Sequence, residues 1–99
     1  MIRHIVTWKL ATEDPAQKAA DAAGIKAGLE ALVGIIDGLS HLEVGVDVGL
    51  LPKNWDVVMV AEYDDNAALE GYQIHPDHIT VSEWIKTVVS DRVCVDYDW

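Results

Sequence analysis

The stretch that decides the fold is Ile2-Arg3-His4-Ile5-Val6-Thr7-Trp8-Lys9-Leu10, in which two kinds of side chain alternate. One set of alternate positions is mostly apolar and consists of Ile2, His4, Val6, Trp8 and Leu10. The other set, Arg3, Ile5, Thr7 and Lys9, is mixed. A period of two is the signature of a β-strand with two different faces. We therefore predict a strand over residues 2–10 that carries His4 on its apolar face.

The rest of the chain continues this pattern with helices and further strands. A helix is predicted from the acidic and proline-containing segment 12–15 to near Gly34, because apolar residues recur there at helical spacing. Two more helical runs follow, one after residues 64–66 and one after Pro76, which breaks the helical pattern. Alternation or a dense run of valines predicts the remaining strands over residues 41–48, 55–63 and 92–98.

The resulting order, βαββαβ, predicts an α+β, ferredoxin-like fold. With right-handed crossovers this order gives a four-stranded antiparallel sheet with the helices on one face. The strand over 55–63 is apolar enough to be buried on both faces, so we expect it to be central. Gly24 and Gly28 lie within the first predicted helix, where each costs about 1 kcal/mol relative to alanine, so we expect another element to pack closely there.

The length of 99 residues predicts one domain, spanning 1–99. So short a chain has no third layer to cover the second face of the sheet, which carries Ile5 and Thr7. We therefore predict a homodimer in which two sheets pair face to face as a dimeric α/β barrel.

Charge and composition exclude several classes of partner. The formal net charge is −10, and the seven Lys and Arg residues are scattered, which argues against nucleic-acid binding. No apolar run approaches the ~20 residues needed to cross a bilayer, so we expect no membrane partner. The N-terminal residues lack a signal-peptide pattern and Cys94 is the single cysteine, so we predict a cytoplasmic protein with an inert core thiol.

Three polar residues are candidates for chemistry because each falls on the apolar face of its own element: His4, Tyr72 and His78. In the predicted fold they can meet around one cavity between sheet and helices. His78 follows Pro76-Asp77 in a first helical turn, where the helix dipole disfavours imidazolium. A neutral His78 can act as general base, and the Tyr72 hydroxyl can hold a carbonyl or enolate oxygen.

Other interpretations of these residues stay open. A buried His or Tyr that bonds to backbone is common in protein cores, so the three could be purely structural. His75 and His78 form an H-x-x-H pair, but Pro76 breaks the helix between them, so we do not expect both to ligate zinc. The chain has no phosphate-binding glycine loop, nucleophile elbow or Cys-x-x-Cys motif, which disfavours those reaction classes.

Several motifs, taken together, resemble one known family over nearly the whole chain. They are Met1-Ile2-Arg3-His4-Ile5-Val6 with Lys9-Leu10, Ile36-Asp37-Gly38-Leu39, Gly45 with Asp47, Asp56, Tyr72-x-x-His75-Pro76-x-His78 and Val95-Asp96-Tyr97. The pattern is similar to that of the stress-responsive A/B barrel (Dabb) family, and Tyr-x-x-His-Pro-x-His is its most specific part. The resemblance implies a ferredoxin-like monomer that pairs with a second copy to form a barrel.

The resemblance also implies candidate residue roles. A plant polyketide-cyclase branch of the family resembles this chain at Tyr72 and His78 and places a histidine like His4 in its pocket. The chain departs from that branch in its alanine-rich first helix, residues 16–31, where the cyclases place bulky aromatic residues around the substrate. Some members bind magnesium through backbone carbonyls after the first helix, and the matching positions are Val33, Ile36 and Leu39. An ordinary helix cap is the alternative interpretation of that segment.

Three hypotheses for function follow. The first is a lyase-like or cyclase-like enzyme that requires no cofactor and acts on a small, partly apolar carbonyl compound, with His78 as base, Tyr72 holding oxygen and His4 assisting. The second is a stress-associated barrel without enzymatic activity that binds a small molecule or is structural. The third is a monooxygenase-like member of the dimeric barrel superfamily. A cavity lined by His4, Tyr72 and His78 would favour the first, and rings packed without a void would favour the second.

Overall fold

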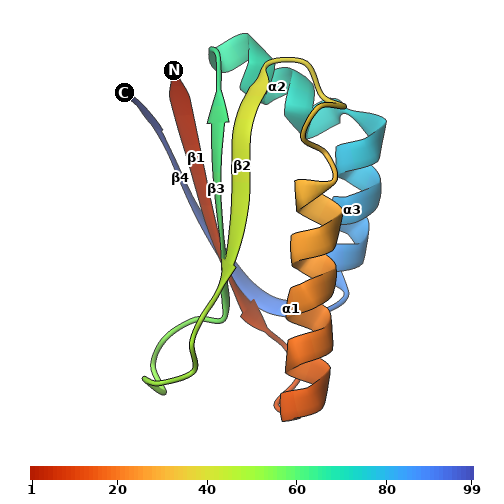
Figure 1. Cartoon of the computed structure of the whole chain (residues 1–99), viewed down its shortest axis with the longest axis vertical. Coiled ribbons are helices and arrows are strands. Elements are labelled where there is room, and N and C mark those ends of the chain that lie inside the picture. Colours follow the sequence, from red (N-terminus) through yellow and green to blue (C-terminus); the bar gives the residue numbers. More distant parts are fainter.

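The computed structural model describes all residues, 1–99, and contains four strands and three helices (Figure 1). In chain order they are β1 (Ile2–Leu10), α1 (Pro15–Glu30), β2 (Leu39–Val46), β3 (Val57–Tyr63), α2 (Asn66–Ile74), α3 (Pro76–Lys86) and β4 (Val89–Asp98). The predicted order of strands and helices is confirmed, with the second helical region divided into α2 and α3.

The four strands form one antiparallel sheet in the order β2-β3-β1-β4. The strand β3 is central, as predicted. Strand β1 pairs with β3 on one side and with β4 on the other, so that His4 lies opposite Ala61 and opposite Asp96. Because directly paired residues point to the same face of a sheet, this register sets which side chains of β4 accompany His4.

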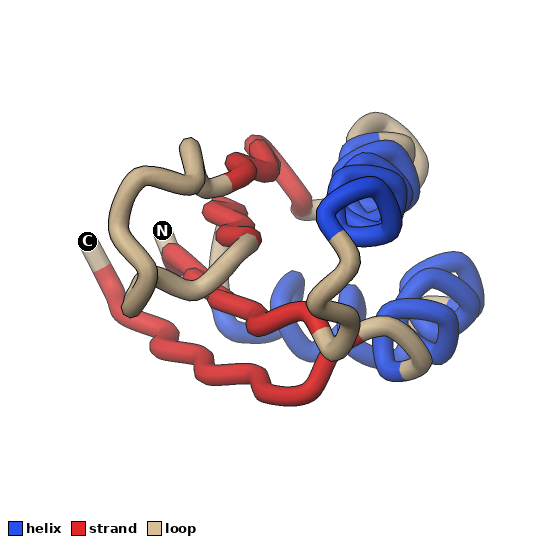
Figure 2. Tube along the Cα trace, turned by 90° about the horizontal axis from the view of Figure 1, so that it is seen from below, coloured by secondary structure: helices blue, strands red, loops and turns tan.

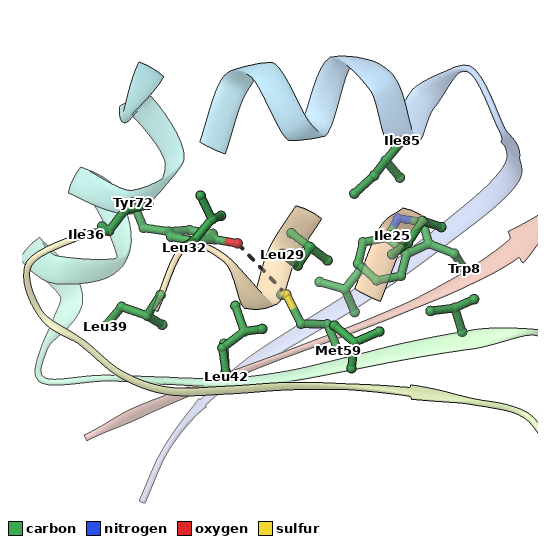
Figure 3. Close-up of a cluster of buried hydrophobic side chains, with 14 of the residues drawn as sticks. Trp8, Ile25, Leu29, Leu32, Ile36, Leu39, Leu42, Met59, Tyr72 and Ile85 are labelled. Carbon is green, nitrogen blue, oxygen red and sulfur yellow. Dashed lines mark hydrogen bonds between the residues drawn. The ribbon is translucent and has the colours of Figure 1, made fainter. Parts of the chain in front are cut away.

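Helices α1 and α3 cover one face of the sheet, and α2 lies across one end (Figure 1). Figure 2 shows the strands on one side and the long helices on the other. The core between these layers is a single cluster of 17 buried hydrophobic residues, several of which appear in Figure 3. In β1 the buried positions are His4, Val6, Trp8 and Leu10, which confirms the predicted face for His4.

Helix α1 begins where the sequence places a cap. The Asp14 carboxylate accepts a hydrogen bond from the Gln17 N–H at 2.9 Å, and Pro15 occupies the first helical position. The helix ends at Glu30, earlier than the predicted end near Gly34. The chain continues in turns instead, and Gly34 adopts a φ of 85°, which an L-residue with a side chain rarely adopts.

The two glycines within α1 allow α3 to approach. A Cβ atom on Gly24 would lie 2.4 Å from the tip of the Trp84 ring, and one on Gly28 would lie 3.1 Å from the Val81 side chain. The first distance is shorter than real Cβ atoms show and the second is tighter than most Cβ contacts, so the glycines allow the observed spacing between these helices. The expected close packing is present.

Burial along β3 shows how far one chain fulfils the prediction that both faces of this strand are buried. The strand begins at Val57, and its residues alternate between buried and half-buried, so only one face lies in the core of this chain. The other face, with Val58 and Val60, has no layer over it. Burial of the second face therefore depends on the predicted partner copy, and it stays a prediction.

The strand ends also differ from the predicted ranges. Strand β2 ends at Val46, and Val48 lies in the following loop, where it is 91% exposed. Strand β4 begins at Val89, three residues before the predicted start. No helix is long and apolar enough to span a bilayer.

Candidate functional site

A cavity of about 420 Å³ lies between the sheet and α3. Its lining includes His4 and Trp8 from β1, Tyr72 from α2, and His78 and Ile85 from α3. Pockets for small ligands usually measure about 300–1,000 Å³, so the volume suits a small molecule. The structure thus brings the three polar residues singled out in the sequence to one cavity.

His78 occupies the first turn of α3 because Pro76 and His75 fix the start of that helix. The His75 ring accepts a hydrogen bond from the Asp77 N–H at 3.1 Å and so serves as the N-cap. The His78 Nδ1 lies 3.3 Å from the Gln73 carbonyl oxygen. Since a carbonyl can only accept, Nδ1 carries the proton and donates it, which leaves a lone pair on Nε2.

Burial is the main cause that lowers the pKa of His78 below its ordinary value of 6.5. The Gln73 carbonyl opposes this effect, and the neighbouring His4, Arg92 and His75 add to it. The uncharged form therefore predominates at pH 7. An uncharged imidazole with a free Nε2 can take a proton from a bound molecule.

Tyr72 lies directly against His78, with ring centroids 4.2 Å apart. Burial raises the pKa of Tyr72 to about 12, so its hydroxyl keeps its proton and can donate. It contacts the Met59 sulfur at 3.9 Å, shown in Figure 3, and the nearby Tyr63 hydroxyl partly offsets the rise in its pKa. A thioether is a weak acceptor, so an oxygen atom of a ligand would be a better partner for this hydroxyl.

His4 lies on the other side of Tyr72, with their ring centroids 6.4 Å apart, and it is 3% exposed. Its Nδ1 contacts the Asp96 carboxylate and also lies 3.3 Å from the Cys94 sulfur. The nitrogen that remains, Nε2, has no protein partner among the hydrogen bonds of His4. The three rings therefore form a polar series along a cavity whose remaining lining is mixed, with apolar side chains such as Trp8 and Ile85 and charged ones such as Arg92.

Sequence reasoning missed three residues that accompany His4. Cys94 and Asp96 belong to the alternating set of β4 that faces the helices, and Tyr63 packs against both His4 and Tyr72 with centroid distances of 6.1 and 5.0 Å. The alternation in β4 separated Cys94 and Asp96 from the valines correctly. The sequence pattern does not give the register between β1 and β4, and this register places Asp96 opposite His4.

Of the positions matched to a family magnesium site, Val33 and Ile36 lie in the connection between α1 and β2, and Leu39 is the first residue of β2. The Ile36 carbonyl accepts a long hydrogen bond of 3.4 Å from the Leu39 N–H, and Gly34 and Gly38 both have positive φ. Carbonyl oxygens keep a second lone pair when they accept one bond, so this donor type fits a hard cation. The residues that would hold the ion are Val33, Ile36 and Leu39.

Comparison with known proteins places the chain in a structural family. The model of the stress responsive A/B barrel domain (Dabb) matches residues 2–99. No curated protein sequence matches the chain.

Solved structures give the same fold. A dimeric protein of unknown function and ferredoxin-like fold from Bacteroides fragilis is 28% identical, with a TM-score of 0.87 over 99% of this chain and 95% of that one. The hydroxynitrile lyase from Passiflora edulis is 14% identical, with a TM-score of 0.77 over 97% of this chain and 90% of that one. An antibiotic biosynthesis monooxygenase is 17% identical, with a TM-score of 0.77 over 100% of this chain and 98% of that one. At these last two identities the likeness concerns the fold alone.

Proposed function

The chain belongs to the stress-responsive A/B barrel family, and from this premise we propose that it is a lyase-like or cyclase-like enzyme acting on a small, partly apolar carbonyl compound. The observation that carries this proposal is the contact of Tyr72 with His78 at one cavity, with centroids 4.2 Å apart. The His78 ring can accept a proton, and the Tyr72 hydroxyl can donate a hydrogen bond. No cofactor is required for that chemistry.

The proposed reaction starts with removal of a proton next to the carbonyl group. Nε2 of His78 takes this proton, while the Tyr72 hydroxyl donates a hydrogen bond to the carbonyl oxygen as negative charge develops on it. The enolate carbon then adds to a second carbonyl, as in ring closure, and the imidazolium of His78 returns its proton to the new alkoxide; without a second carbonyl, the proton returns to carbon. His4 assists by contributing a further polar ring to the same cavity.

The surroundings of the two rings support this assignment. Burial strengthens a hydrogen bond to a developing oxyanion because competing water is excluded. The same burial lowers the pKa of His78, which keeps the base uncharged at neutral pH. The fold likeness to a hydroxynitrile lyase, itself named for lyase activity, is compatible with the proposal.

We propose that the working unit is a homodimer. The uncovered face of the sheet carries apolar side chains that one chain leaves in water, among them Val93 and Val95, which are 52% and 64% exposed. Two related proteins of similar length are described as dimeric. Pairing of two such faces would bury these side chains and form a barrel.

Two further expectations from the sequence stay predictions. The carbonyls of Val33, Ile36 and Leu39 are predicted to bind magnesium, which would act there as a hard cation that ties α1 to β2. A cytoplasmic location is the second.

A binding or structural barrel without enzymatic activity is the alternative, and one observation favours it. Tyr72 is 0% exposed and His4 is 3% exposed, although both border the cavity. A substrate must therefore open a path to the Tyr72 hydroxyl before any reaction. The monooxygenase alternative has only fold likeness in its favour.

Enolisation of a simple ketone tests the proposal. Acetophenone is incubated with the protein in deuterated buffer, and exchange of its methyl protons is followed by NMR. We expect exchange above the buffer rate, with His78→Ala and Tyr72→Phe each lowering the protein-catalysed rate by about 10²-fold or more. His41→Ala, an exposed histidine on β2 away from the cavity, is the matched control and should keep the full rate. Equal rates for wild type and His78→Ala would favour the binding-module alternative.

A further inference from the structure

A second polar cluster lies where β1 and β4 pair, beside the cavity. His4 is opposite Asp96 in the register of the two strands, and Cys94 is opposite Val6. Since paired residues share a face, all three side chains lie on the helix-covered side of the sheet. Imidazole, thiolate and carboxylate are the three side-chain types that bind zinc in proteins.

The donor atoms of the cluster already lie at separations that suit one metal ion. The Cys94 sulfur is 3.3 Å from His4 Nδ1 and 3.6 Å from Asp96 Oδ1, and His4 Nδ1 contacts Asp96 Oδ1 directly. A tetrahedral zinc ion with bonds of about 2.0–2.3 Å holds its ligand atoms roughly 3.3–3.6 Å apart. Only the contact between His4 and Asp96 must widen. The Asp96 side chain is 44% exposed, so it has room to move.

The orientation of the cluster distinguishes a metal site from a catalytic triad. In a nucleophilic triad, the nucleophile and the carboxylate bind opposite nitrogens of the histidine. Here Cys94 and Asp96 both approach the same nitrogen, Nδ1. That nitrogen carries one proton or one lone pair, so it cannot make a full hydrogen bond to both groups. A cation at the centre of the three atoms would satisfy all of them.

An unpartnered hydroxyl beside the cluster points independently to a ligand. Tyr63 is 0% exposed, and its hydroxyl has no hydrogen-bond partner. Burial is the largest cause that raises the pKa of Tyr63, the neighbouring Tyr72 hydroxyl comes next, and Asp96 and Cys94 add smaller contributions. A buried hydroxyl without a partner is costly because it has given up its hydrogen bonds to water, so such groups call for an explanation. Water or a small anion on a metal ion would offer this hydroxyl an acceptor.

We propose that His4, Cys94 and Asp96 form a site for a divalent transition-metal ion of the zinc type, with a fourth position open to water or a small anion. The thiolate and the carboxylate together balance the charge of the ion. The sulfur ligand selects against magnesium and calcium, which prefer oxygen donors. The site shares His4 with the cavity proposed above, but it uses Nδ1 of that ring and leaves the base His78 and the donor Tyr72 unchanged.

Cobalt(II) is the probe for this site because thiolate-bound tetrahedral cobalt absorbs strongly in the near ultraviolet and the visible. The full chain is stripped with a chelator and titrated with Co²⁺, with excess Mg²⁺ present to occupy oxygen sites. We expect saturation at one Co²⁺ per chain with a thiolate-to-cobalt charge-transfer band. Zn²⁺ should then displace the cobalt and abolish the absorption.

Variants assign the ligands. Cys94→Ser should remove the charge-transfer band, and Asp96→Asn should weaken cobalt binding at least tenfold. Asp98→Asn, two residues further along β4, is the matched control and should bind as wild type does. Circular dichroism checks that each variant is folded, and should Cys94→Ser unfold, protection of wild-type Cys94 from a thiol reagent by Zn²⁺ gives the same information. Absence of the band in wild type, its persistence in Cys94→Ser, or unchanged thiol labelling with Zn²⁺ would overturn the proposal.

Discussion

The two faces of the sheet carry similar side chains but lie in different surroundings. On the helix-covered face, Val6 and Met59 are 1% and 2% exposed. On the open face, Ile5 lies opposite Val60 in β3 and opposite Val95 in β4, which forms an apolar row across three strands. Val95 in this row is 64% exposed.

This difference shows what one short chain can and cannot supply for itself. Helices α1 and α3 cover one face and leave a cavity with polar rings within it. The other face is built to the same apolar pattern but has no cover from its own chain. In the proposed homodimer, a second copy would provide a cover of matching shape and chemistry, since a two-fold axis pairs a surface with itself.

The largest expected effect comes from placing a charge in the apolar row. Val95→Asp puts two carboxylates into the proposed interface, one from each copy, and burial of each unpaired charge costs several kcal/mol. We expect the dissociation constant of the dimer to rise by about a thousandfold or more, as measured by sedimentation velocity across a range of concentrations.

Val48→Asp is the control for this change, because the same charge is added at a loop position that is 91% exposed. It should leave the dimer intact. A wild-type protein that sediments as a folded monomer at micromolar concentration would contradict the account of the open face.

A cavity-creating substitution tests the close packing of the helix-covered face. Ile25 in α1 is 0% exposed and belongs to the core in Figure 3. Ile25→Ala should lower the free energy of unfolding by about 2–5 kcal/mol, measured by chemical denaturation, because apolar contacts are lost and a cavity remains. Ile74→Ala, at a position 76% exposed, should change it by less than about 0.5 kcal/mol. Similar values for the two variants would show that this face is not close-packed.

A smaller effect tests the spacing between α1 and α3. Gly71 in α2 has open space where a Cβ atom would lie, so Gly71→Ala should stabilise the fold by up to about 1 kcal/mol through helix propensity. Gly24→Ala has the same propensity gain but would place its methyl group 2.4 Å from the Trp84 ring. We expect it to be destabilising by about 1 kcal/mol relative to Gly71→Ala in thermal or chemical unfolding. An equal gain in stability for Gly24→Ala and Gly71→Ala would mean that the Trp84 ring moves away without cost.

The sequence predicted those features that follow from local periodicity. Alternation in residues 2–10 placed His4 inward, and Pro76 with the helical spacing after it placed His78 at a helix start. The predicted end of the first helix was less accurate, because the turns after Glu30 keep apolar residues at helical spacing without being helical. The valines of β3 predicted two buried faces, of which one chain buries one, since an apolar face that pairs with a partner has the same composition as a core.

Features that depend on strand register could not be predicted. The positions of Cys94 and Asp96 relative to His4 depend on how β4 slides along β1, and alternation alone fixes the face but not the partner. The unpartnered hydroxyl of Tyr63 is likewise a property of the assembled core.

The central claim, that His78 is an uncharged base at the cavity, is tested most directly by the pH dependence of acetophenone exchange. The rate with wild type minus the rate with His78→Ala is measured across pH, and the His78 titration is followed by NMR. Because its pKa is lowered below 6.5, the base form is lost only in acid. We predict that the difference rises with pH, levels off before neutral pH, and has the same midpoint as the His78 titration. A His78 pKa above about 7, or no difference between the two proteins at any pH, would contradict the account.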